Sequence, residues 1–221
     1  MKLDGQPEKR ALPDRYAKMA DLARRLARNG FFDAARIDEE LENDVRYVLG
    51  KERRAREEHT GTLTEDADHE EAVTRLFATV SQIARDELRA LRTATPPEPW
   101  VNARITQAFA ALSAAGIVAL ENPGGTPSAA WSGVVEEAER RRREGEAPWG
   151  ACFYHGQDVD EAVRGKGLYL DHSTLDPQPD ERVTRAILEA LEAHGVAAEW
   201  SGDLHRRIRV LPFEWFRRPP S

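Results

Sequence analysis

Hydrophobic residues recur at helical spacing through the first half of the chain. Large apolar side chains appear every three or four residues in three stretches, over residues 16–26, 33–49 and 70–92. That period places them on one face of an α-helix, so it predicts three amphipathic helices. Residues 51–69 contain few large apolar side chains and include a Thr-Gly-Thr sequence, so we expect an exposed, mobile connection there.

The pattern changes after a proline-rich stretch at Thr95–Pro99. Proline has no amide proton and restricts the residue before it, so the third helix cannot continue through this stretch. We therefore expect a domain boundary here, with an acidic helical region over residues 1–95 and a second domain over residues 96–221.

Short apolar runs alternate with helical periods in the second half. The last two runs flank a Ser-Gly-Asp-Leu sequence and alternate apolar with polar residues, which is typical of a β-hairpin. Helices between strands favour some parallel pairing, whereas a hairpin is antiparallel. The second domain is therefore predicted to be α+β, with helices packed on a mixed β-sheet and the element order αβαβαβαββ. The predicted strands are Ile117–Leu120, Gly150–His155, Leu168–Leu170, Val196–Trp200 and Arg207–Leu211.

Two helices of this domain have recognisable starts. Asp158, with Glu161 three residues later, matches the spacing of a capping box and predicts a short helix with Asp158 as its N-cap. Another helix is predicted from Asp180 to a stop at His194-Gly195.

Composition narrows the classes of function. Hydrophobic residues make up 40% of the chain and charged residues 32%, which suits a folded protein with a very polar surface. The formal net charge of −7 repels phosphate backbones and anionic lipids, so we expect no nucleic-acid partner and no membrane partner. Cys152 is the only cysteine, which excludes an intramolecular disulfide and fits a cytoplasmic location.

His155, Gln157 and Asp158 form the first candidate binding site. They lie between a predicted strand and a predicted helix, a position where α/β sheets often place ligand-binding groups. A histidine near a carboxylate can act as acid or base, and Gln157 can orient a substrate amide or hydroxyl. The alternative is structural, with Asp158 capping the helix and His155 bonding locally.

The hairpin turn is the second candidate site. Asp203 and Arg206, beside His205 and Arg207, can recognise an anionic group or an acidic surface. Polar residues are also what a tight turn requires, so the structural alternative stays open here too.

Other notable residues favour structural roles. Asp171 and His172 are candidate metal ligands with His155, but the chain has no HExxH-type spacing, so we expect neither a metal site nor a cofactor. Cys152 lies inside a predicted strand, which favours a buried side chain over a nucleophile. The run Arg140–Arg143 ends a helix among glutamates, and we expect a solvated helix end rather than an RNA-binding patch.

Two groups of motifs resemble a known family. They are Tyr154-His155-x-Gln157-Asp158 followed by Gly165-x-Gly167-Leu168-Tyr169-Leu170, and Glu199-Trp200-x-Gly202-Asp203 followed by Arg206-Arg207-Ile208. On these motifs the chain resembles an uncharacterised bacterial family of domains of unknown function, over residues 100–216 and into the preceding helices. Many members carry a cysteine-rich turn after the first strand, where this chain has Asn-Pro-Gly-Gly-Thr-Pro, so the resemblance implies no metal or redox role.

Three functions fit these observations. We favour a non-catalytic cytosolic protein-binding or regulatory module with a protein partner. The second is a small hydrolase- or transferase-like enzyme with His155 as base, Asp158 orienting it, and Gln157 or Arg206 binding substrate. The third is a toxin-antagonist, or immunity-type, protein, since an acidic protein can neutralise a basic toxin. The oligomeric state stays open.

Overall fold

The chain forms two compact units. The computed structural model describes residues 8–62, 65–176 and 181–220. The described residues up to Ala94, with those from Arg218 onward, make the first unit, and Thr95–Arg217 make the second. The expected domain of residues 96–221 therefore differs at its end. Hydrogen bonds explain the difference, because Arg218 Nη1 donates to the Arg92 carbonyl at 2.8 Å.

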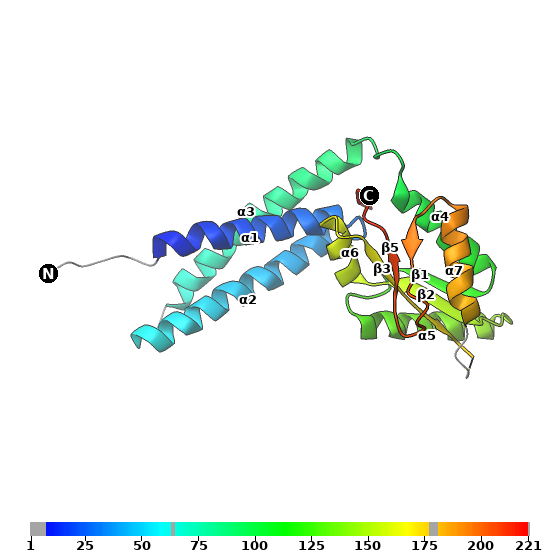
Figure 1. The fold of residues 1–221 in the computed structure, drawn as a ribbon. Helices are drawn as coiled ribbons and strands as arrows, with labels where there is room; N and C mark the ends of the chain where they lie inside the picture. Colours follow the sequence, from blue (N-terminus) through cyan, green and yellow to red (C-terminus); the bar gives the residue numbers. More distant parts are fainter. Residues whose placement is uncertain (1–7, 63–64, 177–180, 221) are drawn as a thin grey trace. The chain divides into compact units, whose positions relative to one another are not determined.

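Three long helices make up the first unit (Figure 1). They are α1 (Glu8–Arg28), α2 (Ala34–Thr60) and α3 (Asp66–Thr93). Their apolar stripes pack together, as the helical period predicts. The buried core residues of this unit are Met19, Ala23, Ala27, Ile37, Leu41, Val45, Leu49, Val73, Val80, Ala84 and Leu88.

The connection expected over residues 51–69 is largely exposed where the structure describes it, as predicted, but most of it is helical, so its interpretation as a connection is wrong. Helix α2 continues to Thr60 and ends at Gly61, whose φ of 66° is left-handed. Helix α3 already begins at Asp66. Charged side chains support the extension of α2, since Arg53 pairs with Glu57 one turn later at 2.9 Å. Long charged residues have high helix propensity, so this stretch is helical without an apolar stripe.

The second unit is an α+β domain with a mixed five-stranded sheet, as predicted. The strand order is β1-β2-β3-β5-β4, with β1 and β2 parallel and the other neighbours antiparallel. The predicted element order is confirmed, although the helix expected from Asp180 has its first residue outside the described range. The elements are α4 (Val101–Ala114), β1 (Ile117–Glu121), α5 (Pro127–Arg143), β2 (Gly150–Tyr154), α6 (Gly156–Val163), β3 (Leu168–Thr174), α7 (Glu181–Ala193), β4 (Ala198–Glu199) and β5 (Ile208–Val210).

Strand β2 lies between β1 and β3 in the sheet and is buried along its whole length. Gly150 permits close packing, because a Cβ atom there would lie 2.7 Å from a methyl group of Val183 on α7. Cys152 is completely buried, and burial raises the pKa of its thiol, with the negative charge of Asp171 adding to the effect. Because β1 and β2 are parallel, the loops that follow them meet at one edge of the sheet.

No helix among the described residues is long and apolar enough to cross a membrane.

Candidate functional site

His155 directly follows strand β2 and is the N-cap of helix α6. Its backbone N–H donates to Asp158 Oδ2 at 3.0 Å, so Asp158 caps the helix from the third helical position. The expectation that Asp158 is itself the N-cap is therefore wrong. The helix begins at Gly156, which lacks a side chain and so permits the close approach of the loop after β1: a Cβ there would lie 3.1 Å from the Gly125 Cα.

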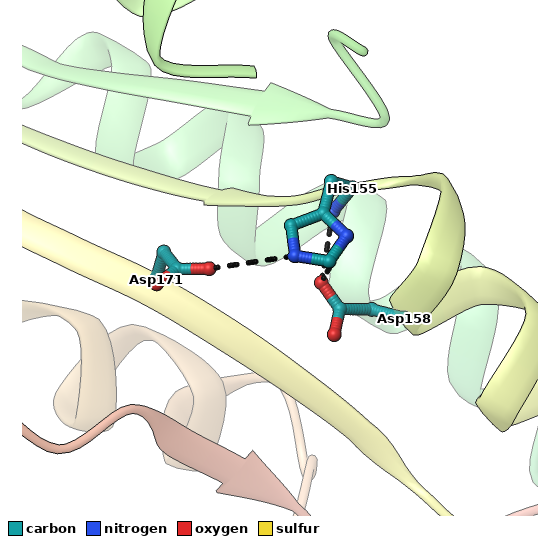
Figure 2. Close-up of side chains that lie close together, drawn as sticks. All are labelled: His155, Asp158 and Asp171. Carbon is teal, nitrogen blue, oxygen red and sulfur yellow. Dashed lines mark hydrogen bonds and ion pairs between the residues drawn. The ribbon is translucent and has the colours of Figure 1, made fainter. Parts of the chain in front are cut away.

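The imidazole of His155 lies between two carboxylates (Figure 2). Nδ1 is 3.1 Å from Asp158 Oδ2, and Nε2 is 4.0 Å from Asp171 Oδ2 on strand β3. The side chain is only 3% exposed, and neither ring nitrogen makes a hydrogen bond of good geometry to any described residue. Burial lowers the pKa of His155 despite the opposing effect of Asp158, while burial raises the pKa of Asp171.

Arg207 connects the two carboxylates. Its Nη2 is 2.6 Å from Asp158 Oδ2, and its Nε is 3.0 Å from Asp171 Oδ2. Nη2 also donates to the Tyr169 carbonyl at 3.1 Å, and the guanidinium lies over the Tyr169 ring. One guanidinium therefore forms ion pairs with two carboxylates. The lowered pKa of the neighbouring His155 favours its neutral ring.

Sequence reasoning grouped Asp171 with His155 only as candidate metal ligands, and it did not connect Arg207 to either of them. The structure does so through strand register: β3 pairs antiparallel with β5, and Tyr169 lies opposite Arg209. Two residues further along, the same register brings Asp171 beside Arg207. Opposite charges across neighbouring strands are the signal for this pair, but it can be recognised only once the pairing is known.

The predicted hairpin residues lie in a separate, exposed place. Asp203 and Arg206 are both exposed, with Arg206 Nε 3.9 Å from Asp203 Oδ2. They border an open hollow of about 690 Å³, which we call the arginine hollow. Its lining residues are Glu199, Trp200, Ser201, Asp203, Arg206, Arg207 and Arg209.

Arg207 is the residue shared by the two candidate sites. It lines the arginine hollow and pairs with the carboxylates beside His155. Gln157, by contrast, is exposed and does not line the arginine hollow, whereas His155 and Asp158 are buried. We therefore do not count Gln157 as part of the buried group around His155.

Two other groups from the sequence have structural roles. The ring nitrogens of His172 are held by the Arg206 carbonyl at 3.0 Å and by Thr184 Oγ1 at 3.1 Å, so this imidazole is engaged away from His155. Arg141, expected at a solvated helix end, is only 8% exposed. It is buried because its guanidinium donates to the Ile117 carbonyl and pairs with Glu137.

The group around His155 has two chemical capacities. An imidazole beside a carboxylate is the arrangement of an acid–base pair, but 3% exposure leaves a substrate little access to it. His155, Asp158 and Asp171 also offer one nitrogen and two oxygen ligands, all within 4.8 Å of one another. Imidazole nitrogen and carboxylate oxygen are ligands that zinc and similar metals accept.

The chain belongs to a family defined by a domain of unknown function (DUF6891), which matches residues 13–219. The match extends over both units, including α2, α3 and most of α1 in the first. The resemblance to an uncharacterised domain family is thereby confirmed. No curated protein and no solved structure matches the chain.

Proposed function

We propose that this protein is a non-catalytic binding module that recognises an acidic segment of a partner protein at the arginine hollow. The observation that carries the proposal is the lining: three guanidiniums and a tryptophan border one hollow in a chain of net charge −7. Arginine and tryptophan are the residues most enriched among those that dominate binding energy at protein interfaces.

Two of these arginines, Arg206 and Arg209, have solvent-accessible side chains and form only long ion pairs within the part of the chain that the structure describes. Among the described residues, the closest carboxylates to Arg206 and Arg209 are those of Asp203 and Glu199 respectively, each at 3.9 Å. Their side chains are 77% and 42% exposed. Ion pairs of such length and exposure contribute little, so a carboxylate from a partner can replace them at small cost.

The burial of His155 supports binding over catalysis. A general base must come within hydrogen-bond reach of the proton that it removes, but the His155 side chain is only 3% exposed and its ring nitrogens face the carboxylates of Asp158 and Asp171. On this proposal the two carboxylates of the buried group pair with Arg207 at the edge of the hollow. An acidic partner also differs from the basic partner of the toxin-antagonist hypothesis.

The first prediction concerns the two exposed arginines. Full-length Arg206→Ala/Arg209→Ala protein should bind a fluorescein-labelled peptide rich in Asp and Glu about tenfold more weakly than wild type, because two guanidiniums are lost. Fluorescence anisotropy at low and physiological salt measures the affinity. Arg185→Ala is the matched control, since Arg185 is 69% exposed on α7 and does not line the hollow.

Equal weakening in Arg185→Ala would show a general charge effect and would contradict the proposal. So would unchanged binding in the double variant. Wild type and the Arg206→Ala/Arg209→Ala variant then serve as baits in native lysate. A partner that binds wild type and not the double variant is identified by mass spectrometry.

A further inference from the structure

Several polar atoms around His155 are buried and make no hydrogen bond of good geometry, although Asp158 and Arg207 lie within ion-pair distance of two of them. Among the described residues they include both ring nitrogens of His155 and Oδ2 of Asp171. Roughly 90% or more of buried polar groups in proteins are hydrogen-bonded. Leaving a buried polar group unsatisfied is costly, so a small cluster of such atoms requires an explanation. A bound ion that accepts these atoms as ligands is one such explanation.

The charges of the cluster are also unbalanced. The carboxylates of Asp158 and Asp171 have side chains only 5% and 21% exposed, and both pair with the single guanidinium of Arg207. Two negative charges therefore face one positive charge in a largely buried place. Leaving a charge uncompensated there is costly, and a divalent cation balances two carboxylates completely.

We propose that His155, Asp158 and Asp171 bind a divalent transition-metal ion, which replaces the guanidinium of Arg207 between the two carboxylates. One nitrogen and two oxygens suit zinc, manganese or cobalt, with water completing the coordination. Ligands about 2.1 Å from a tetrahedral zinc ion lie roughly 3.4 Å from one another. The ligand atoms already lie within 4.8 Å of one another, and His155 Nδ1 is 3.1 Å from Asp158 Oδ2, so small side-chain movements suffice.

Arg207 is able to leave the cluster. Its side chain extends from the hairpin, is 33% exposed and already borders the arginine hollow. The metal and the guanidinium compete for the same two carboxylates. This competition separates a metal site from a purely structural ion-pair network, because removing the guanidinium should strengthen metal binding in the first case only.

The experiment uses the full chain after treatment with a chelator. Cobalt(II) is titrated while its visible absorption is recorded, and zinc and manganese are titrated by calorimetry. Wild type should bind one equivalent. His155→Gln and Asp171→Asn should each weaken metal binding by about 100-fold or more, because each removes a direct ligand. Loss of a residue that only supports a ligand typically weakens metal binding by about 10- to 100-fold. Arg207→Gln should bind about tenfold more tightly, because a competing cation is gone.

His205→Gln is the matched control, because its imidazole is exposed on the hairpin and should not affect binding. Circular dichroism of the metal-free variants checks their fold, and Arg207→Gln tests the proposal with all three ligands intact. Binding that survives His155→Gln, or that is lost in His205→Gln, would overturn the proposal. Failure of both wild type and Arg207→Gln to bind any of the three metals below millimolar concentration would do the same. The peptide experiment above does not depend on this result.

Discussion

Arg141 is a buried cation near the end of helix α5, and the carboxylate of Glu137 balances its charge. Glu137 Oε1 accepts from Arg141 Nε at 2.7 Å, while both oxygens accept from Arg140 at 2.8 Å. The hydrogen bonds from Arg140 make the largest contribution, that from Arg141 adds to it, and together they lower the pKa of Glu137 from 4.5 to about 2. Folding therefore favours the ionised carboxylate, and the stabilisation depends on pH.

Glu137→Gln tests this coupling. A folded-state pKa below the unfolded one gives stabilisation that is present above about pH 4.5 and is lost as the pH falls towards 2. Near neutral pH the variant should be less stable than wild type by about 1 kcal/mol, and the difference should shrink as the pH falls through this range. Urea unfolding across the range measures it. Glu136→Gln, an exposed neighbour on α5, should show a smaller and flatter difference.

Residue-level features could be predicted where they depend on neighbours in sequence. The turn at His155–Asp158 was recognised as a cap, but its start was placed three residues late, because the close approach of Gly125 to Gly156 is a tertiary contact. The pairing of Asp171 with Arg207 depends on strand register and could not be predicted. Arg141 differs from the other arginines of its run only through packing against α4 and β1, which the run itself does not reveal.

At the scale of elements, periodicity predicted the helices and strands well and failed in one kind of segment. Helices with an apolar stripe and strands between turn residues were found because burial imposes their spacing. The second half of α2 and the start of α3 were missed, since they are charged and present no such stripe. Their helicity depends instead on propensity and on pairs such as Arg53 with Glu57.

Two glycine substitutions test the extent of helix α2. Gly50→Ala should raise the free energy of unfolding by about 0.5–1 kcal/mol, because Gly50 lies inside the helix and an added Cβ meets only ordinary contacts. Gly61→Ala should lower it by about 1–2 kcal/mol, because Gly61 has a φ of 66°. Urea unfolding followed by far-ultraviolet circular dichroism measures both. A mobile connection over residues 51–69 would instead leave Gly61→Ala nearly neutral.

At the scale of the whole molecule, the two units can be followed separately. All five tryptophans lie between residues 100 and 215, so tryptophan fluorescence reports only the second unit. That unit has its own core, including Val118, Val134, Ala151 and Phe153. The arginine hollow and the group around His155 also lie entirely within it. A domain with its own core can in principle fold alone.

A fragment of residues 95–217 should therefore fold and keep the proposed binding properties. By tryptophan fluorescence it should unfold within about 1 kcal/mol of the full chain, since no core residue of the second unit is removed. Its affinity for the acidic peptide should match that of full-length protein, and Arg206→Ala/Arg209→Ala should weaken it equally. A folded fragment that binds more weakly would assign part of the recognition to the helical unit. A fragment without cooperative unfolding would show that the second unit needs the rest of the chain for its stability.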